Sequence, residues 1–284
     1  MKYSTIITKT ICLSVPFFAL SCEDPQEEFS YIPPEVIYSQ PGNVEDYNTP
    51  GDNAGDNDDD DKVWVDNTPI LEFREAAFLE AAIAEHADRN GDGKISEKEA
   101  ALVGSLTINE SNVQSTEDLR FFPELETFQF QFNPNVSVID LSHNPKLREL
   151  DCAYTAITKL DLSHNPDMRA LLCMSNQLEE INVSTCPELI ALSCDLNPNL
   201  QELNLQKNTK ITDLLCSGCG LFVLDLSKCE ALANLRCDDN NLTSLDLSNN
   251  RQLSKLGVSE NQLIELTLWS GHKKQLEPSV IEGI

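Results

Sequence analysis

The chain has 284 residues, enough for one or two domains, and a formal net charge of −27 at pH 7. So large an acidic excess, with no basic stripe to neutralise phosphates, argues against binding to nucleic acid. It also argues against adhesion to anionic lipid through surface charge.

The first 21 residues have the pattern of an export signal. Lys2 and Lys9 supply positive charge, and residues 11–20 form a mostly apolar run. A run of this length is too short to remain as a membrane-spanning anchor. We therefore expect residues 1–21 to be a signal peptide that is removed from the mature protein.

The signal ends in Ala19-Leu20-Ser21-Cys22, which resembles the bacterial lipobox. The resemblance implies that Cys22 becomes an acylated N-terminus that anchors the protein to a membrane. The acidic residues 23–28 resemble the tract that sends lipoproteins of Bacteroidota to the outer surface of the outer membrane. An ordinary signal peptide with a chance cysteine is the alternative.

Residues 22–68 are predicted to form a disordered acidic tether. They hold 14 acidic residues against one base, Lys62, and few apolar residues. Turn-forming pairs such as Pro33-Pro34 and Pro41-Gly42 interrupt the segment. A chain of this composition buries too little apolar surface to offset the entropy of folding.

Residues 88–99 resemble the twelve-residue calcium loop of an EF-hand. Gly93 stands at loop position six, where the chain must turn sharply, and Ile95 is the apolar residue that such loops bury. Oxygen ligands are expected from six residues: Asp88, Asn90, Asp92, Lys94 through its carbonyl, Ser96 through water, and Glu99. The sequence therefore predicts one Ca²⁺ site. The alternatives are a solvated acidic turn and half of a dockerin.

The segments beside this loop predict a helix-loop-helix unit over residues 69–104. Thr68 can cap a helix that begins at Pro69 and continues through residues 71–87, and residues 96–103 can form a shorter exit helix. Sensor proteins pair two calcium loops, whereas one is visible here. We therefore expect a structural ion in a unit that caps the open end of the repeats.

A repeat of 21 to 22 residues runs through residues 105–270. Each of its eight turns contains two short runs in which apolar and polar residues alternate, which is typical of strands with one buried face. Stacked turns of this kind predict two parallel sheets around a flat core. Residues 271–284 are a tail without an evident capping helix.

The repeat resembles the leucine-rich repeat family, in its nested bacterial class of 21 residues. The resemblance implies a repeat solenoid with two short parallel strands per turn, preceded by the EF-hand cap. It also implies an inward asparagine ladder that bonds backbone at the bends: Asn133, Asn176, Asn197, Asn240 and Asn261. Ser111, Thr155 and Cys219 replace asparagine in the other turns, and residues 117–122 form a helical insert.

Eight cysteines lie in the repeats, and their phase predicts that they are buried and free. Five occupy the inward position of a strand: Cys152, Cys173, Cys194, Cys216 and Cys237. Cysteines on neighbouring turns are too far apart for an easy disulfide, and buried thiols pack as small apolar groups. Cys216 and Cys219 form a CxxC string, for which redox chemistry or zinc is the alternative.

Motifs for catalysis are missing from the sequence. His143 and His164 fall in Ser-His-Asn-Pro corners one turn apart, where solvated turn residues are expected, although metal binding is conceivable. The sequence holds no Ser-His-Asp set, zinc-protease motif or phosphate loop. We therefore predict a protein that is not an enzyme.

The outward positions of the cysteine-bearing strands predict a binding surface. Leu172, Met174 and Leu215 stand there as apolar residues facing water, unless a loop covers them. Exposed apolar groups with a polar rim often mark protein contacts. The polar residues chosen as candidates for the same surface are Gln129, Gln131, Asp151 and Arg236. The second row of strands shows Asp and Asn outward, as a solubilising face.

These observations predict a monomeric leucine-rich-repeat lipoprotein of the bacterial cell surface that binds a protein or glycan partner and carries a structural Ca²⁺ ion. A scaffold component of an outer-membrane uptake or degradation complex is the second hypothesis. A hydrolase is the third, and it lacks a visible nucleophile and base.

Overall fold

The computed structural model describes residues 66–111 and 113–269, which fall in one compact unit. The predicted signal peptide, Cys22, nearly all of the tether and the tail at 271–284 lie outside these residues. Within them, no helix has the length and apolar character needed to cross a bilayer.

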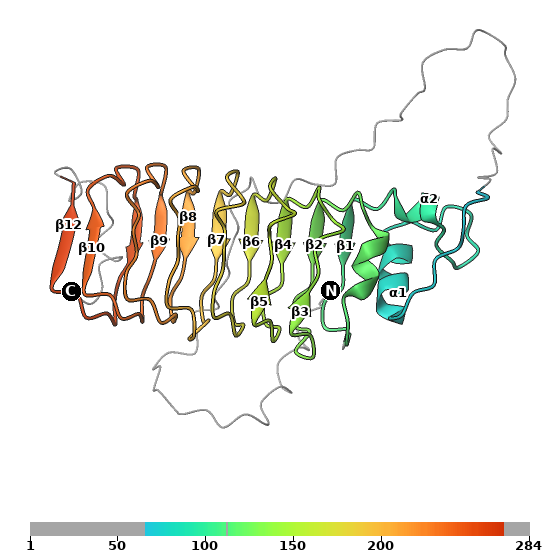
Figure 1. The fold of residues 1–284 in the computed structure, drawn as a ribbon, viewed down its shortest axis with the longest axis horizontal. Coiled ribbons are helices and arrows are strands. Elements are labelled where there is room, and N and C mark those ends of the chain that lie inside the picture. The colour runs from blue at the N-terminus through green and yellow to red at the C-terminus, as the bar shows by residue number, and fades with distance from the viewer. Residues whose placement is uncertain (1–65, 112, 270–284) are drawn as a thin grey trace, which may run out of the picture. The chain divides into compact units, whose positions relative to one another are not determined.

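One strand from each of eight turns joins a continuous parallel sheet (Figure 1). In spatial order its strands are β1 (Ser105–Thr107), β2 (Thr127–Gln129), β4 (Glu149–Asp151), β6 (Ala170–Leu172), β7 (Ala191–Ser193), β8 (Asp213–Leu215), β9 (Asn234–Arg236) and β11 (Lys255–Gly257). The middle residue of each strand is buried and pairs in register with the middle residue of the next, as Leu150 does with Leu171. The predicted solenoid of eight turns is confirmed.

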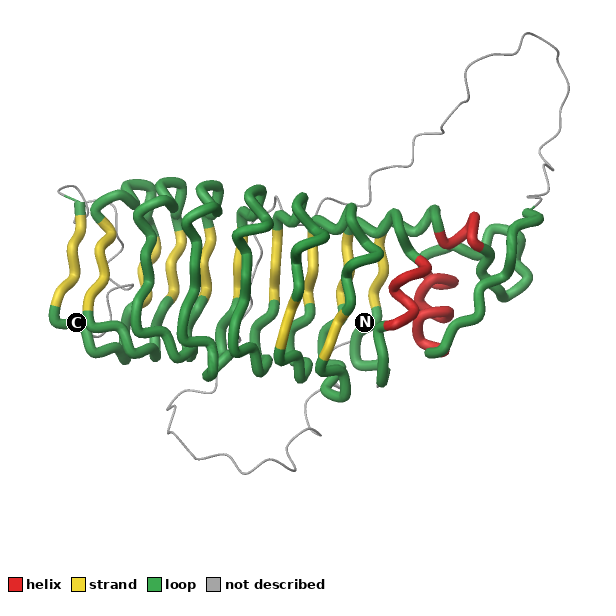
Figure 2. The backbone as a smooth tube through the Cα atoms, in the orientation of Figure 1, coloured by secondary structure: helices red, strands yellow, loops and turns green. Residues whose placement is uncertain are grey.

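The second row of strands is not a continuous sheet, so that part of the prediction is wrong. It consists of two separate pairs, β3 (Val138–Ile139) with β5 (Lys159–Leu160) and β10 (Ser244–Leu247) with β12 (Glu265–Leu268). Between the pairs the chain runs as loops, which Figure 2 colours green. In six second segments an Asp or Asn side chain accepts the N–H two residues later, as Asn182 does from Ser184 at 3.1 Å. The same bond is present beside β3 and β5 and in β10, so it shapes the bends without deciding where strands pair.

In each turn, the strand of the eight-stranded sheet is followed by the same bend. One residue adopts the left-handed conformation, with a φ between 52° and 63°, directly before the ladder position; this residue is Glu110, Phe132, Tyr154, Ser175, Leu196, Gly218, Asp239 or Glu260. The asparagine ladder then bonds backbone as predicted. Asn197 donates to the carbonyls of Cys173 and Cys194 at 3.0 and 2.8 Å.

Hydrogen bonding also continues where asparagine is replaced. Thr155 Oγ1 donates to the Cys152 carbonyl at 3.1 Å, and Cys219 Sγ donates to the Cys194 carbonyl at 3.2 Å. The Ser111 hydroxyl donates to Asn133 Oδ1 at 3.0 Å. A second ladder on the other side of the core includes Asn208, whose amide donates to the carbonyls of Val183 and Cys186 at 2.9 and 2.8 Å.

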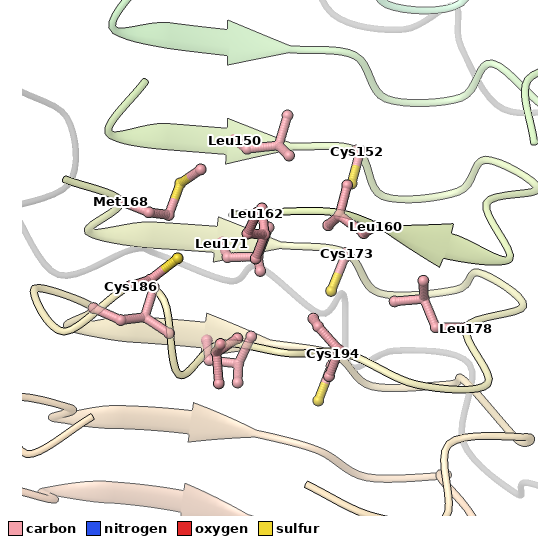
Figure 3. Close-up of a cluster of buried hydrophobic side chains, with 14 of the residues drawn as sticks. Leu150, Cys152, Leu160, Leu162, Met168, Leu171, Cys173, Leu178, Cys186 and Cys194 are labelled. Atoms are coloured by element: carbon pink, nitrogen blue, oxygen red, sulfur yellow. The ribbon is translucent and has the colours of Figure 1, made fainter. Parts of the chain in front are cut away.

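The core is a single stack of apolar side chains that extends from the helical unit into the repeats. Figure 3 shows Leu150, Leu171 and the thiols of Cys152, Cys173 and Cys194 on successive turns. Phe78 belongs to the same buried cluster, and its ring centroid lies 6.4 Å from that of Phe128. The helical unit therefore covers the first turn of the solenoid with apolar surface.

Both helices of the helical unit are shorter than predicted. Its first helix, α1, spans Ala76–Ala84, and its second, α2, spans Glu97–Ala100. Thr68 does not cap α1, because its hydroxyl and N–H both donate to Asp66 and the residues after it are extended. The predicted helical insert of the first turn is present as a 3₁₀ helix, η1, at Glu117–Phe121.

Candidate binding face and candidate calcium loop

The outward residues of the eight-stranded sheet lie on one side of the solenoid, because every strand alternates an inward apolar residue with outward neighbours. The outward residues of β6 and β7 are buried, whereas those of the other six strands are partly or fully exposed. Gln129, Gln131 and Asp151 meet on this surface, where the Gln131 amide donates to Asp151 Oδ2. Arg236 lies farther along, and its Nε is 3.8 Å from Asp238 Oδ2. The four polar candidates therefore share one face.

The apolar candidates on this face are less exposed than predicted. Leu172 retains only 9% of its surface, and Met174 and Leu215 are half-buried. Leu172 still lies outside the core cluster, because Leu171 beside it points inward. Its register neighbours are Asp151 and Ser193, and the other outward residues of β6 and β7, Ala170, Ala191 and Ser193, are buried with it. Leu172 is therefore not the exposed anchor that the sequence predicts.

The exposed apolar residues of this side lie instead at the left-handed bend position. Phe132, Tyr154 and Leu196 keep 43%, 41% and 52% of their surface. The rings of Phe132 and Tyr154 stack with centroids 4.6 Å apart and planes at 8°. Sequence reasoning missed these residues because it treated the bend only as a turn. The signal was an apolar residue directly before a ladder position, as in Phe132-Asn133 and Leu196-Asn197.

Carboxylates on the outward face are tied to neighbouring polar groups. Asp195 accepts from the Ser217 N–H at 2.8 Å and from the Ser193 hydroxyl at 2.9 Å. Burial raises the pKa of Asp195 and of Asp151 above the usual value for aspartate, although these hydrogen bonds oppose the shift. Arg236 also acts to lower the pKa of Asp195, so one cation of this face already interacts with that carboxylate.

The opposite side of the solenoid carries the predicted row of outward Asp and Asn residues, and these have a structural role. Asp161 accepts the Ser163 N–H at 2.9 Å, and Asp225 accepts the Ser227 N–H at 3.0 Å. These hydrogen bonds lower the pKa of both aspartates. The row therefore holds the bends in shape.

A shallow surface depression also lies on the opposite side. It is lined by Lys159, Leu160, Asp161, Glu180, Ile181 and Asn182, with no hydroxyl, thiol or imidazole group in this lining. His143 and His164 are exposed, and His164 Nδ1 lies 3.1 Å from the Ser163 hydroxyl. This depression offers no pairing of a nucleophile with a base.

All eight cysteines of the repeats are buried, as predicted, and none of the eight takes part in a disulfide. Burial raises the pKa of the Cys229 thiol to about 11 and that of Cys173 well above its usual value. The Cys219 thiol of the CxxC string donates to backbone carbonyls, the nearer being that of Cys194. Cys219 therefore makes the same kind of hydrogen bond to backbone as the asparagines of the ladder, and this structural role explains the second cysteine of the CxxC string.

The candidate calcium loop has a tight turn built around Asp88. Oδ1 of Asp88 accepts the Gly91 N–H at 2.8 Å and Oδ2 accepts the Gly93 N–H at 2.8 Å. Gly91 and Gly93 both have positive φ, 73° and 76°, which glycine adopts without strain. Asn90 and Asp92 accept the N–H groups of Asp92 and Lys94, both at 2.9 Å. The side-chain oxygens of the first half of the loop thus gather around its own backbone.

Glu99, the last predicted ligand, is fully buried at the start of α2. Its carboxylate accepts the Ser96 N–H at 2.9 Å and the Arg89 N–H at 2.8 Å, and the Ser96 hydroxyl accepts the Glu99 N–H, which is a capping box. The donor set of oxygens alone is the chemistry that Ca²⁺ prefers. Among the described residues, however, no three His, Cys, Asp or Glu side chains already lie close enough to hold a metal ion.

The loop also pairs with the chain that precedes α1. The Leu71 N–H donates to the Ile95 carbonyl at 2.8 Å, and the Glu97 N–H donates to the Pro69 carbonyl at 2.9 Å, around an antiparallel bridge between Ile70 and Ser96. The second half of the loop therefore makes its backbone hydrogen bonds with residues 69–71 of the same helical unit.

Comparison with known proteins agrees with the repeat fold. Residues 196–214 and 238–260 match the family model described as leucine-rich repeat. The functional domain of InlJ from Listeria monocytogenes, which includes a cysteine ladder, is 31% identical, with a TM-score of 0.54 over 66% of this chain. Internalin C2 from the same organism is 17% identical, with a TM-score of 0.58 over 69% of this chain and 94% of its own, and shows the fold alone.

The chain spans 45% of the length of the InlJ domain that it matches. The ladder of buried cysteines at Cys152, Cys173, Cys194, Cys216 and Cys237 corresponds in kind to the feature named for that domain. A search of curated proteins found no match.

Proposed function

We propose that this protein is a lipid-anchored binding protein of the bacterial cell surface that recognises a protein partner through the outward face of the sheet from β1 to β11. The observation that carries the proposal is the register of this face: eight strands align side by side, and six of them present polar or half-buried apolar side chains on the same side of the solenoid. The leucine-rich repeat fold is typical of domains that bind other proteins, and a long open face suits a macromolecule better than a small ligand.

The anchor in this proposal is the acylated Cys22, which the lipobox resemblance supports. The tether then holds the solenoid away from the membrane. If Cys22 is the anchor, Cys22→Ser leaves the exported protein in the soluble fraction, whereas the wild type sediments with membranes. Equal sedimentation of the two proteins would contradict the anchor.

The binding proposal is tested by affinity capture from surface extracts of the source cells. The double variant Gln129→Arg/Arg236→Glu alters two outward residues, and Val223→Asp is the matched control, since Val223 is 71% exposed on the opposite side. We expect wild type and Val223→Asp to recover the same discrete protein and the double variant to lose it. Equal recovery by all three would sink the proposed face.

We further propose that Ca²⁺ binds the loop at 88–99 and stabilises the helical unit. The oxygen-only donor set supports this, and ligands would come from Asp88, Asn90, Asp92, the Lys94 carbonyl, Ser96 and Glu99. A bound Ca²⁺ ion would attract these oxygens in place of the backbone N–H groups that they now accept. Because Glu99 belongs to α2, the ion would also join α2 to the first half of the loop. The ion is structural, because the loop pairs with residues 69–71 and not with a second calcium loop.

Thermal unfolding with and without Ca²⁺ tests this site. Wild type is expected to gain several degrees in Tm with millimolar Ca²⁺, since a ligand that binds only the folded state stabilises it. Asp88→Asn/Asp92→Asn should lose the gain, and Mg²⁺ should give little of it. If the Tm of the wild type is unchanged by Ca²⁺, the proposed calcium site is contradicted.

A further inference from the structure

Three exposed apolar side chains lie along one edge of the binding face. Phe132, Tyr154 and Leu196 occupy the same bend position in three turns, and we call them the apolar ridge. The N–H groups of these residues donate to carbonyls of the following turn: Phe132 to Ala153 at 3.1 Å, Tyr154 to Met174 at 3.0 Å and Leu196 to Ser217 at 2.8 Å. Their backbone is therefore fixed, and the ridge is presented rigidly.

Folding accounts only in part for the apolar residues of the ridge. The left-handed conformation costs a residue with a Cβ about 1 kcal/mol, and glycine, asparagine and aspartate adopt it most readily. Two other turns have Gly218 and Asp239 at this position. The rings of Phe132 and Tyr154 gain from stacking on each other, and the Leu196 side chain lies beside Gly218 of the next turn. Each of the three side chains nevertheless leaves 41% or more of its surface in water, and this exposed apolar surface is available to a partner.

The surroundings of the ridge are acidic. The outward positions carry five carboxylates, Glu149, Asp151, Asp195, Asp213 and Asp238, against the two cations Arg236 and Lys255, and Arg169 acts on Glu149 from beside the face. Asp195 directly precedes Leu196 of the ridge. Ser175, whose side chain is short, stands between the turns of Tyr154 and Leu196, so the bend position of that turn contributes no bulky side chain to the ridge.

We propose that the apolar ridge recognises a cationic segment of a partner protein, in which arginine side chains alternate with apolar ones. A guanidinium group can lie against the Tyr154 ring beside Ser175 while it pairs with Asp195, and apolar side chains can pack on Phe132 and Leu196. Charge complementarity selects this partner over an acidic or neutral one. The proposal rests on the proposed function and deepens it by naming the chemical class of the partner.

Variants that preserve both charge and fold test the ridge. Tyr154→Asn/Leu196→Asn removes two apolar groups, leaves every charge in place and supplies a residue that tolerates the left-handed conformation. Val223→Asn is the control, since it removes an exposed apolar group from the opposite side. Thermal unfolding should show that the ridge variant retains a cooperative folded state, with at most a small loss from the stacking of Tyr154 on Phe132.

The probe is a synthetic twelve-residue peptide with arginine at alternate positions and leucine between them, and a peptide with glutamate in place of arginine is its counterpart. We expect the full chain to bind the arginine peptide in fluorescence anisotropy, and Kd to weaken at least tenfold in Tyr154→Asn/Leu196→Asn but not in Val223→Asn. Equal Kd values for wild type and ridge variant would overturn the proposal, because attraction by charge alone would then explain binding.

Binding of the glutamate peptide with similar affinity, or no binding of the arginine peptide, would also overturn it. Neither result would decide the proposed function. That depends on whether Gln129→Arg/Arg236→Glu loses the cellular partner, and both of its substitutions leave Phe132, Tyr154 and Leu196 unchanged.

Discussion

The asparagines of the two ladders differ in how many hydrogen bonds each side chain makes. Asn197 uses both ends of its amide, because its Oδ1 also accepts the Leu178 N–H at 3.0 Å. Asn208 uses only its Nδ2, and its Oδ1 is buried without a partner among the described residues. A thiol can replace a donor but not an acceptor of this strength, which explains why Cys186 and Cys229 are tolerated in the second ladder.

Two of the three replacements in the first ladder, Thr155 and Cys219, follow bends that are one residue longer. In these bends, Asn133-Pro-Asn-Val136 and Asn197-Pro-Asn-Leu200, the last N–H donates to the carbonyl of the first asparagine, at 3.2 and 2.9 Å. The next ladder position then has no N–H to accept, and Thr155 and Cys219 stand there. The sequence shows both the longer bends and the replaced asparagines, but only the hydrogen bonds reveal that the first explains the second.

The same substitution in the two ladders should therefore have different costs. Asn197→Cys leaves the buried Leu178 N–H without an acceptor, whereas Asn208→Cys leaves no N–H unpaired. We expect Asn197→Cys to lower the free energy of unfolding by about 1 to 3 kcal/mol more than Asn208→Cys. Urea unfolding of the two variants measures the difference, and equal losses would contradict the distinct roles of the ladders.

Single residues were predicted correctly where the repeat alone decides them. The inward leucines and cysteines follow from the period, whereas the exposure of Leu172 and Phe132 depends on neighbours in other turns and on the direction of the bend. A sequence period gives the position of a side chain within its turn. How much of it water reaches is set by the three-dimensional packing around it.

The helix α1 begins without a capping side chain of its own. Its N-cap residue, Glu75, makes no side-chain cap, and Oδ2 of Asp118 in η1 instead accepts the N–H groups of Arg74 and Glu75, both at 2.8 Å. Asp118 is fully buried. The helical unit and the first turn are therefore joined by a carboxylate as well as by apolar contact. This contact links residues over 40 positions apart, so local sequence patterns did not predict it.

Replacement of Asp118 should loosen α1. Asp118→Ala removes the oxygen that accepts both N–H groups at the helix start, and we expect a loss of about 1 to 2 kcal/mol in the free energy of unfolding and faster hydrogen exchange in α1. Asp118→Asn keeps an oxygen acceptor and should lose less. If amides of α1 exchange at the wild-type rate in Asp118→Ala, the carboxylate does not hold this helix.

Over the whole molecule, two groups of carboxyls respond to acid in opposite directions. Burial raises the pKa of Glu149, Asp151 and Asp195 in the folded state, so the folded chain binds these protons first and gains stability as the pH falls from neutrality. The pKa values of the bend aspartates Asp140, Asp161, Asp225 and Asp246 are lowered by hydrogen bonds to the residues that follow. Their contribution is present above the unfolded pKa of about 3.9 and is lost as the pH falls through the folded values.

The free energy of unfolding should therefore rise from pH 7 to a maximum at mildly acidic pH and then fall in stronger acid. Relief of repulsion in a chain of net charge −27 acts in the same direction during the rise. Urea unfolding across this pH range measures the curve, and Asp151→Asn/Asp195→Asn should flatten its rise. A steady decline from pH 7 downward would show that the buried carboxyls do not act as described.

The most direct test of the central claim, that the outward face of the eight-stranded sheet binds a protein, is site-specific photocrosslinking on intact cells. A photoreactive residue is placed at Gln129, at Arg236 or, as the control, at Val223 on the opposite side. The account predicts that Gln129 and Arg236 cross-link to the same discrete protein and that Val223 does not. Cross-links from Val223 alone, or none from either outward position, would contradict it.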